Sequence, residues 1–149
     1  MKIELRKVKG HDGPDSFCFV ADLYVDGKKQ CQVSDDGHGG SIHFDDLRVC
    51  DQLNIYANSL PEISFGDGMD GTFKQDADWL VRDALDTYLE NKQLKKACTK
   101  KTLFRLVGDE AGNWYTIKEP YSPSVESYIK KTYGNKLEEI ANDRFRRAT

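Results

Sequence analysis

The sequence predicts an α+β fold, with an antiparallel sheet of about five strands in two hairpin units packed with about four helices. Apolar and polar residues alternate in the first part of the chain, as in a half-buried strand. Apolar residues recur at helical spacing in several later segments. Short turns join the predicted strands in pairs, without regular strand–helix alternation, so a doubly wound α/β fold is not expected.

The first predicted strands cover residues 2–9 and 16–25, and residues 28–34 return as a third. Asp26-Gly27 marks the hairpin turn between the last two. The second strand has an apolar face at every other position, formed by Phe17, Phe19, Ala21, Leu23 and Val25.

The register of this hairpin follows from its buried face. A two-residue loop at Asp26-Gly27 would place Gln32 opposite Ala21, so that a polar side chain would lie beside the apolar face. A three-residue loop, Val25-Asp26-Gly27, with the glycine in a left-handed bulge, places Val33 opposite Phe19 and Cys31 opposite Ala21. The sequence therefore favours the bulged three-residue turn.

Two helices are predicted after a loop over residues 35–46. The first carries Leu47, Cys50, Leu53, Ala57 and Leu60, with Asp45 or Asp46 as N-cap and Pro61 as its stop. A second loop covers residues 61–72. A long helix then runs from about 73 to 97, and Thr72-Phe73-Lys74-Gln75 fits a capping box.

The last third of the chain predicts a second hairpin and two more helices. The hairpin strands cover residues 102–107 and 113–118. Ser122-Pro123 begins a helix that stops at Gly134. A final helix carries Leu137, Ile140, Ala141 and Phe145.

Length and composition indicate a single α+β domain over residues 1–149. The net charge of −3 gives no whole-protein basic field for nucleic acid. No apolar run approaches the length of a membrane span, and the N-terminus does not resemble a signal peptide. We therefore expect a cytoplasmic protein with no membrane partner, in which all four cysteines are reduced.

Two loops carry the most distinctive polar residues. All three histidines, His11, His38 and His43, lie in or near loops that the hairpin register places at the same end of the sheet. Histidine and aspartate side chains there could bind a divalent metal, which makes a metal-dependent enzyme one alternative. The other interpretation is that the glycines form left-handed turns while Asp and His cap backbone groups.

A basic run is the main charge asymmetry of the chain. Its residues are Lys92, Lys95, Lys96, Lys100, Lys101 and Arg105. Lysines at a helix C-terminus are favoured by the helix dipole, which explains Lys95 and Lys96 without any ligand. The functional alternative is a surface for an anionic partner, such as nucleic acid or an acidic protein.

The segment Asp35-Asp36-Gly37-His38-Gly39-Gly40, directly after a hairpin, resembles uncharacterised small phage and prophage proteins. These carry an Asn-Asp-Gly-His-Gly-Gly segment after the same hairpin. The stretch from Lys118 to Ile140 also resembles their C-terminal part. Asp35 departs from the pattern, which has Asn at that position. The resemblance implies a mobile-element setting and carries over no catalytic residue.

The sequence as a whole favours a non-enzymatic interaction protein, such as a phage-encoded modulator or inhibitor of a host or defence complex. We expect no cofactor, a protein as partner, and nucleic acid only as an alternative. Asp35, Asp36 and His38 are expected to form a rigid recognition surface on the Gly-rich loop. The full set of candidate binding residues is Asp35, Asp36, His38, Gly39, Gly40, Lys95, Lys96 and Lys100.

Overall fold

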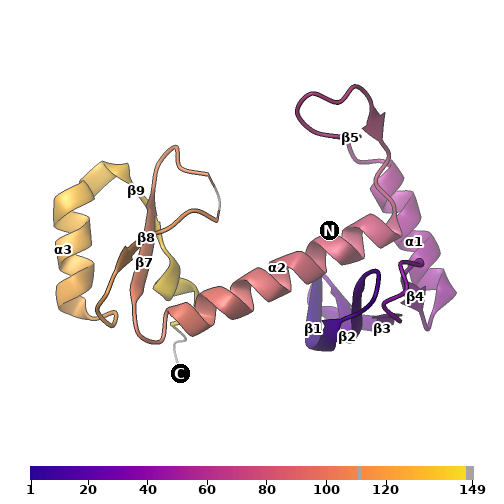
Figure 1. Cartoon of the computed structure of the whole chain (residues 1–149), viewed down its shortest axis with the longest axis horizontal. Helices are drawn as coiled ribbons and strands as arrows, with labels where there is room; N and C mark the ends of the chain where they lie inside the picture. Colours follow the sequence, from indigo (N-terminus) through magenta and orange to yellow (C-terminus); the bar gives the residue numbers. More distant parts are fainter. Residues whose placement is uncertain (111, 147–149) are drawn as a thin grey trace. The chain divides into compact units, whose positions relative to one another are not determined.

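The computed structural model describes residues 1–110 and 112–146 (Figure 1). The fold is α+β, as predicted, with three α-helices and nine strands in three antiparallel sheets among the described residues. The sequence indicated one domain over 1–149. In the structure the chain divides into two compact units: unit 1, Met1–Tyr88, and unit 2, Leu89–Thr149.

Unit 1 is built on a four-stranded sheet whose order follows the chain. Its strands are β1 (Ile3–Asp12), β2 (Phe17–Val25), β3 (Lys28–Asp35) and β4 (His43–Phe44). The apolar face predicted for β2 is confirmed at its centre, where Phe19, Ala21 and Leu23 are buried, whereas Phe17 and Val25 at its ends are half-buried. The three buried side chains form the core of unit 1 with further residues from β3, α1 and α2, namely Val33, Leu53, Val81 and Leu85.

The predicted register of the β2–β3 hairpin is wrong. Val33 lies opposite Ala21, not Phe19, and Cys31 lies opposite Leu23. The turn is the tight two-residue Asp26-Gly27 type, with positive φ at both residues. An irregularity in the pairing between Leu23 and Tyr24 then shifts the register, so the apolar residues still face one another.

Two helices and a small hairpin complete unit 1. Helix α1 (Leu47–Asn58) begins at Asp46 as N-cap, as predicted. The hairpin strands are β5 (Ile63–Ser64) and β6 (Thr72–Phe73), where the sequence indicated only a loop.

Helix α2 (Ala77–Ala97) begins in unit 1 and ends in unit 2. It starts four residues later than the expected start near Phe73, because Phe73 pairs in β6. The predicted capping box at Thr72 is therefore wrong, and Asp76 accepts the Trp79 N–H instead. Neither α2 nor any other helix in the described part of the chain is long and apolar enough to cross a bilayer.

The described part of unit 2 contains the end of α2, a three-stranded sheet and one further α-helix. The strands are β7 (Thr102–Leu106), β8 (Tyr115–Ile117) and β9 (Leu137–Ile140), with β7 in the centre. Helix α3 (Pro123–Tyr133) begins after Ser122 and ends at Gly134, both as predicted. Its buried residues join those of β7 and β9 in a small core of Phe104, Val125, Ile129 and Ile140.

The predicted final helix is wrong. Residues Leu137–Ile140 form strand β9, which pairs with β7 and places Ile140 opposite Phe104. Only a short 3-10 helix, Ala141–Arg144, follows it. Leu137, Ile140 and Ala141 suit a helical face by spacing alone, but the free edge of β7 offers a strand partner, so pairing decides the structure here.

Candidate functional site

Asp35 is the centre of a buried polar cluster in unit 1. Asp35 is only 4% exposed, and its carboxylate lies 3.0 Å from the Arg82 guanidinium of α2. The same carboxylate accepts the Gly37 N–H at 2.7 Å and the Ser16 hydroxyl at 3.1 Å. Asp35 therefore joins β3, the β1–β2 loop and α2, and we call these contacts the Asp35 clasp.

The cluster favours the charged form of Asp35. Burial alone would raise the pKa of this carboxyl, but the hydrogen bonds from Gly37, Arg82 and Ser16 outweigh it, so the pKa lies below its ordinary value. The carboxylate is thus ionised at neutral pH and fully engaged by its neighbours. Such an acid has a structural role and is not available to a ligand.

The β1–β2 loop and the Gly-rich loop lie against each other at one end of the sheet, as predicted. The Gly37 carbonyl accepts the N–H groups of both Asp15 and Ser16, at 2.9 and 3.1 Å. A Cβ built on Gly13 would lie 2.7 Å from the Gly37 Cα, so a side chain does not fit there. His11 and Asp12 themselves belong to β1, where they pair with Cys18 and Phe17.

The rest of the Gly-rich loop is held by a series of hydrogen bonds. Asp36 accepts the His38 N–H at 3.0 Å, and Gly39 donates its N–H to the Ser16 hydroxyl at 3.1 Å. The Gly40 carbonyl accepts from Arg82 at 3.0 Å. Asp36, His38, Gly39 and Gly40 are exposed, whereas Asp35 is not. The expectation that Asp35 contributes to a recognition surface is therefore wrong. Asp35 is buried and stabilises the loop through its hydrogen bond from the Gly37 N–H.

No group of three or more His, Cys, Asp and Glu side chains in the described residues is arranged to hold a metal ion. The paired loops bring their backbones together, but their side chains do not converge. The alternative of a metal-dependent enzyme at this end of the sheet thus lacks a geometric basis in the described part of the chain.

A second surface of unit 1, the β5–β6 hairpin, was missed by the sequence analysis. Phe65 and Met69 in this hairpin are exposed by 51% and 63%, and Trp79 in the first turn of α2 is exposed by 36%. The Phe73 ring links two of these side chains, because its centre lies 5.3 Å from the Phe65 ring centre and 5.2 Å from that of Trp79. The rings therefore form one contiguous apolar surface, which we call the aromatic hairpin.

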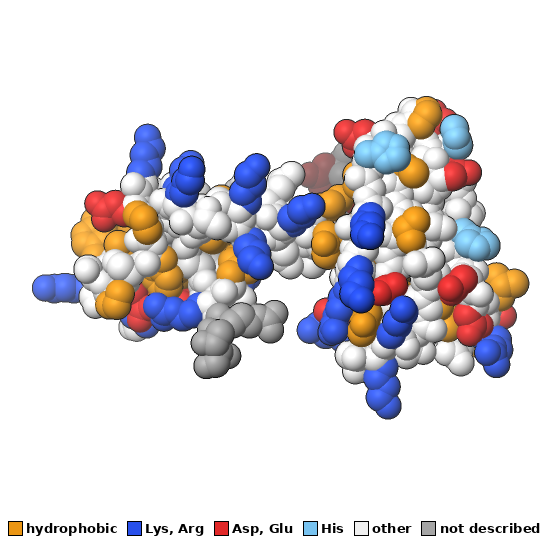
Figure 2. Space-filling view, turned by 90° about the horizontal axis from the view of Figure 1, so that it is seen from below, with side chains coloured by type: hydrophobic (Ala, Val, Ile, Leu, Met, Phe, Trp, Pro, Cys, Tyr) orange, Lys and Arg blue, Asp and Glu red, His pale blue; other side chains and the backbone are white. Residues whose placement is uncertain are grey.

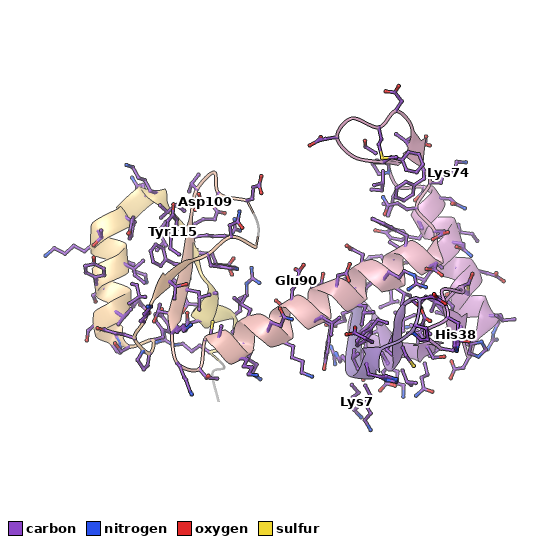
Figure 3. All side chains as sticks on the ribbon, viewed as in Figure 1. Lys7, His38, Lys74, Glu90, Asp109 and Tyr115 are labelled. Atoms are coloured by element: carbon purple, nitrogen blue, oxygen red, sulfur yellow. The ribbon has the colours of Figure 1, made fainter. Side chains whose placement is uncertain are left out.

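Acidic residues surround the aromatic hairpin. Residues 61–76 contain Glu62, Asp67, Asp70 and Asp76 against a single basic residue, Lys74. None of these four carboxylates has an ion pair with another described residue. In Figure 3 the hairpin lies beyond Lys74 and well away from His38, so it is a separate surface from the Gly-rich loop.

The predicted basic residues at the end of α2 are exposed. Lys95 and Lys96 occupy its last turn, and Lys100 follows in the turn before β7. Arg105 does not belong with them, because its guanidinium lies 3.6 Å from Glu139 and 5.9 Å from the centre of the Trp114 ring.

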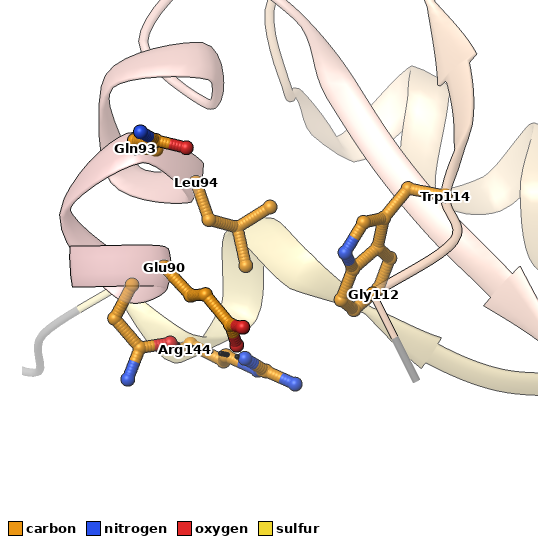
Figure 4. Close-up of a pocket in the computed structure, with 7 residues that line it drawn as sticks. Glu90, Gln93, Leu94, Gly112, Trp114 and Arg144 are labelled. Atoms are coloured by element: carbon orange, nitrogen blue, oxygen red, sulfur yellow. Dashed lines mark hydrogen bonds between the residues drawn. The ribbon is translucent and has the colours of Figure 1, made fainter. Parts of the chain in front are cut away.

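Unit 2 also contains an open pocket of about 420 Å³ between the end of α2 and Trp114 (Figure 4). Leu94 points across it toward the indole ring, and Glu90 and Arg144 lie at its edge. Arg144 is already engaged: it bonds to Glu139 at 2.9 Å and to Asn91 at 3.2 Å, and lies 5.3 Å from the centre of the Trp114 ring. The positive charge of Arg144 at this pocket is therefore already paired, and Glu90 is the other charged residue in its described lining.

Comparison with known proteins identifies no relative. No protein-family model, curated protein or solved structure that was compared with the chain matches it.

Proposed function

We propose that this protein is a non-enzymatic interaction protein that binds a partner protein through the aromatic hairpin of unit 1. The observation that carries the proposal is the run of contacting rings Phe65, Phe73 and Trp79, with the exposed side chain of Met69 in the same hairpin loop. Aromatic side chains and methionine are enriched in protein–protein interfaces, and buried aromatic anchors supply most of the binding energy there.

Contiguity distinguishes the aromatic hairpin from other exposed apolar residues of unit 1. Leu47 and Ile55 on α1 are more exposed, at 71% and 74%. They lie eight residues apart, about 12 Å along a helix, and single exposed apolar side chains of this kind are normal on protein surfaces. The hairpin instead presents rings in contact with one another.

The charges around the hairpin define the chemistry of the partner. Four carboxylates and one lysine within residues 61–76 favour an apolar groove with a basic rim. Opposite charges at the rim would speed association and exclude acidic proteins more than they would deepen affinity. Following the resemblance to small phage proteins, we propose a host or defence protein as the class of partner.

Site-specific photocrosslinking in host cells tests this proposal. A photoreactive phenylalanine analogue replaces Met69, and a matched variant carries it at Ile55, which lies in the same unit and is somewhat more exposed, at 74% against 63%. We expect one protein to crosslink from Met69 and not from Ile55, and we expect Phe65→Ser to abolish that crosslink. The Asp67→Lys/Asp70→Lys pair should weaken binding of the same protein.

Equal crosslinking from Ile55 and Met69, or a crosslink from Met69 that Phe65→Ser leaves unchanged, contradicts the proposal. Circular dichroism of each variant provides the folding control. Because Phe65, Asp67 and Asp70 are exposed, their substitution is expected to change stability little.

A further inference from the structure

The end of α2 and the turn after it form the strongest uninterrupted positive charge in the chain. Residues 91–108 contain six basic residues and no acidic one. Five of them are lysines with exposed side chains, which we call the lysine surface: Lys92, Lys95, Lys96, Lys100 and Lys101. Figure 2 shows more Lys and Arg than acidic side chains on the visible face of the part formed by unit 2.

The lysine surface is not neutralised by the acids of unit 2. Glu139 pairs with Arg105 and Arg144, and Glu126 pairs with Lys130 and Arg146. No lysine of the surface has an ion pair with another described residue. The helix dipole accounts for Lys95 and Lys96 in the last turn. Lys100 and Lys101 lie beyond the helix, where that explanation does not apply.

The backbone that carries the lysines is held rigidly by one buried side chain. The Asn142 amide donates to the carbonyls of Cys98 and Lys101, at 3.3 and 2.8 Å, and accepts the Leu103 N–H at 3.0 Å. Asn142 is buried, and these bonds fix the turn between α2 and β7. A partner would therefore meet the lysines on an ordered backbone, which lowers the entropy cost of binding.

We propose that the lysine surface binds the phosphodiester backbone of nucleic acid. Lys92, Lys95 and Lys96 share one side of the helix at spacings of three and four residues. From Lys92 to Lys96 the helix advances about 6 Å, and one nucleic-acid strand carries a phosphate about every 3.4 Å. The helical lysines thus span roughly two to three phosphates, and Lys100 and Lys101 add further cations in the turn that follows.

An acidic protein is the less suitable partner for this surface. A protein interface needs an apolar core, and the exposed large apolar residues of unit 2, such as Val107, Tyr115 and Tyr128, lie outside residues 92–101. Binding to a phosphate backbone needs only positioned cations and releases condensed counterions. This inference is independent of the aromatic hairpin, which lies in unit 1.

Fluorescence anisotropy of the full chain tests the proposal. The probes are a labelled poly(dT) strand and a labelled duplex, each about 20 nucleotides long, beyond the roughly 4–16 nucleotides of typical single-strand sites. The patch variant is Lys95→Gln/Lys96→Gln/Lys100→Gln. The matched control, Lys118→Gln/Lys131→Gln/Lys136→Gln, removes the same charge from other exposed positions of unit 2.

We expect the patch variant to bind about tenfold or more weakly at about 50 mM salt, and the control less than about twofold more weakly. The slope of log affinity against log salt should fall by about 2 for the strand and by about 2.7 for the duplex. Unchanged Trp114 fluorescence would show that unit 2 remains folded in both variants.

Three results overturn the proposal. The first is no binding of either probe at about 50 mM salt, where phosphate contacts are strong. The second is equal weakening by the patch and control variants, which would mean diffuse attraction. The third is displacement of the oligonucleotide by polyglutamate as effectively as by unlabelled poly(dT), which would assign the surface to an acidic protein.

Discussion

Unit 1 and unit 2 differ in the sign of their charge and in what those charges do. Unit 1 contains 17 Asp and Glu against nine Lys and Arg, a formal charge of −8. Unit 2 contains eight Asp and Glu against 13 Lys and Arg, a formal charge of +5. The overall charge of −3 conceals this division, which is why the sequence as a whole indicated no basic field.

Many of the acids of unit 1 have structural partners. Seven aspartates accept a backbone N–H within unit 1, and most of them hold loops or begin helices: Asp26, Asp35, Asp36, Asp45, Asp46, Asp76 and Asp78. The lysines of unit 2 at residues 92–101 have no comparable partners among the described residues. Asp67 and Asp70 in unit 1 likewise have no such partner among the described residues, and they and the lysine surface lie where we propose that each unit binds its partner.

The largest effect is expected from removing the Asp35 clasp. Asp35→Ala leaves the Gly37 N–H, the Ser16 hydroxyl and Arg82 without their partner, which should cost unit 1 about 2–4 kcal/mol. His38→Ala, on the exposed part of the same loop, should cost less than about 0.5 kcal/mol.

Tryptophan fluorescence during urea unfolding measures this effect in each unit separately. The chain has two tryptophans, Trp79 in unit 1 and Trp114 in unit 2. In a Trp114→Phe background the Trp79 transition should move to lower urea in Asp35→Ala. If His38→Ala shifts it equally, the loop tip and not Asp35 holds the structure.

A smaller effect is expected from closing the space between the two loops of unit 1. Gly13→Ala places a Cβ 2.5 Å from the Ser16 carbonyl oxygen and should cost about 1–3 kcal/mol. Gly40→Ala is the matched control, because a Cβ there has no neighbour within 4 Å. Equal stability of the two variants in thermal unfolding would show that the loops do not pack as described.

Lowering the pH should decrease the unfolding free energy of unit 1, partly because Asp35 becomes protonated. Its pKa is lower in the folded protein than the ordinary value near 3.9 of the unfolded chain, so its stabilising contribution is complete above about pH 5. That contribution is lost as the pH falls through 3.9 toward the folded pKa. Urea unfolding at several pH values should show a shallower acid dependence in Asp35→Asn than in the native protein. An unchanged dependence would show that Asp35 is not the carboxylate that titrates.

The smallest effect is expected where charges lack structural partners. Asp67→Asn/Asp70→Asn in unit 1 and Lys100→Gln/Lys101→Gln in unit 2 should each change the unfolding free energy by less than about 0.5 kcal/mol. The fluorescence of Trp79 reports unfolding of unit 1, and that of Trp114 reports unfolding of unit 2. A larger loss of unfolding free energy for either pair would mean that these charges stabilise the fold.

Local patterns in the sequence were sufficient for several elements. The alternation in β2, the Asp46 cap of α1 and the Ser122-Pro123 start of α3 all follow from neighbours in the chain. Elements that depend on distant partners were not predicted. Strand β9 forms because β7 offers a free edge, although its spacing also suits a helix.

The same limit applies to the candidate site. The role of Asp35 depends on Arg82, 47 positions along the chain, and no local pattern indicates that pairing. The aromatic hairpin was missed because its two-residue strands are too short to show alternation. The only available signal was an apolar residue on each side of the glycines, at Phe65 and Phe73. In the first hairpin the sequence predicted the buried face correctly but the strand register wrongly. The turn is a tight two-residue one, and an irregularity in the pairing after it brings the apolar residues of the two strands opposite each other again.

The central claim is that the two units bind different partners through surfaces of opposite charge. Titration of the ¹⁵N-labelled full chain with unlabelled poly(dT), followed by NMR amide shifts, tests it most directly. The account predicts shift changes at residues 92–101 and none at Asp36, His38, Phe65 or Met69. Shift changes centred in unit 1, or none at residues 92–101 while the oligonucleotide binds, would contradict it.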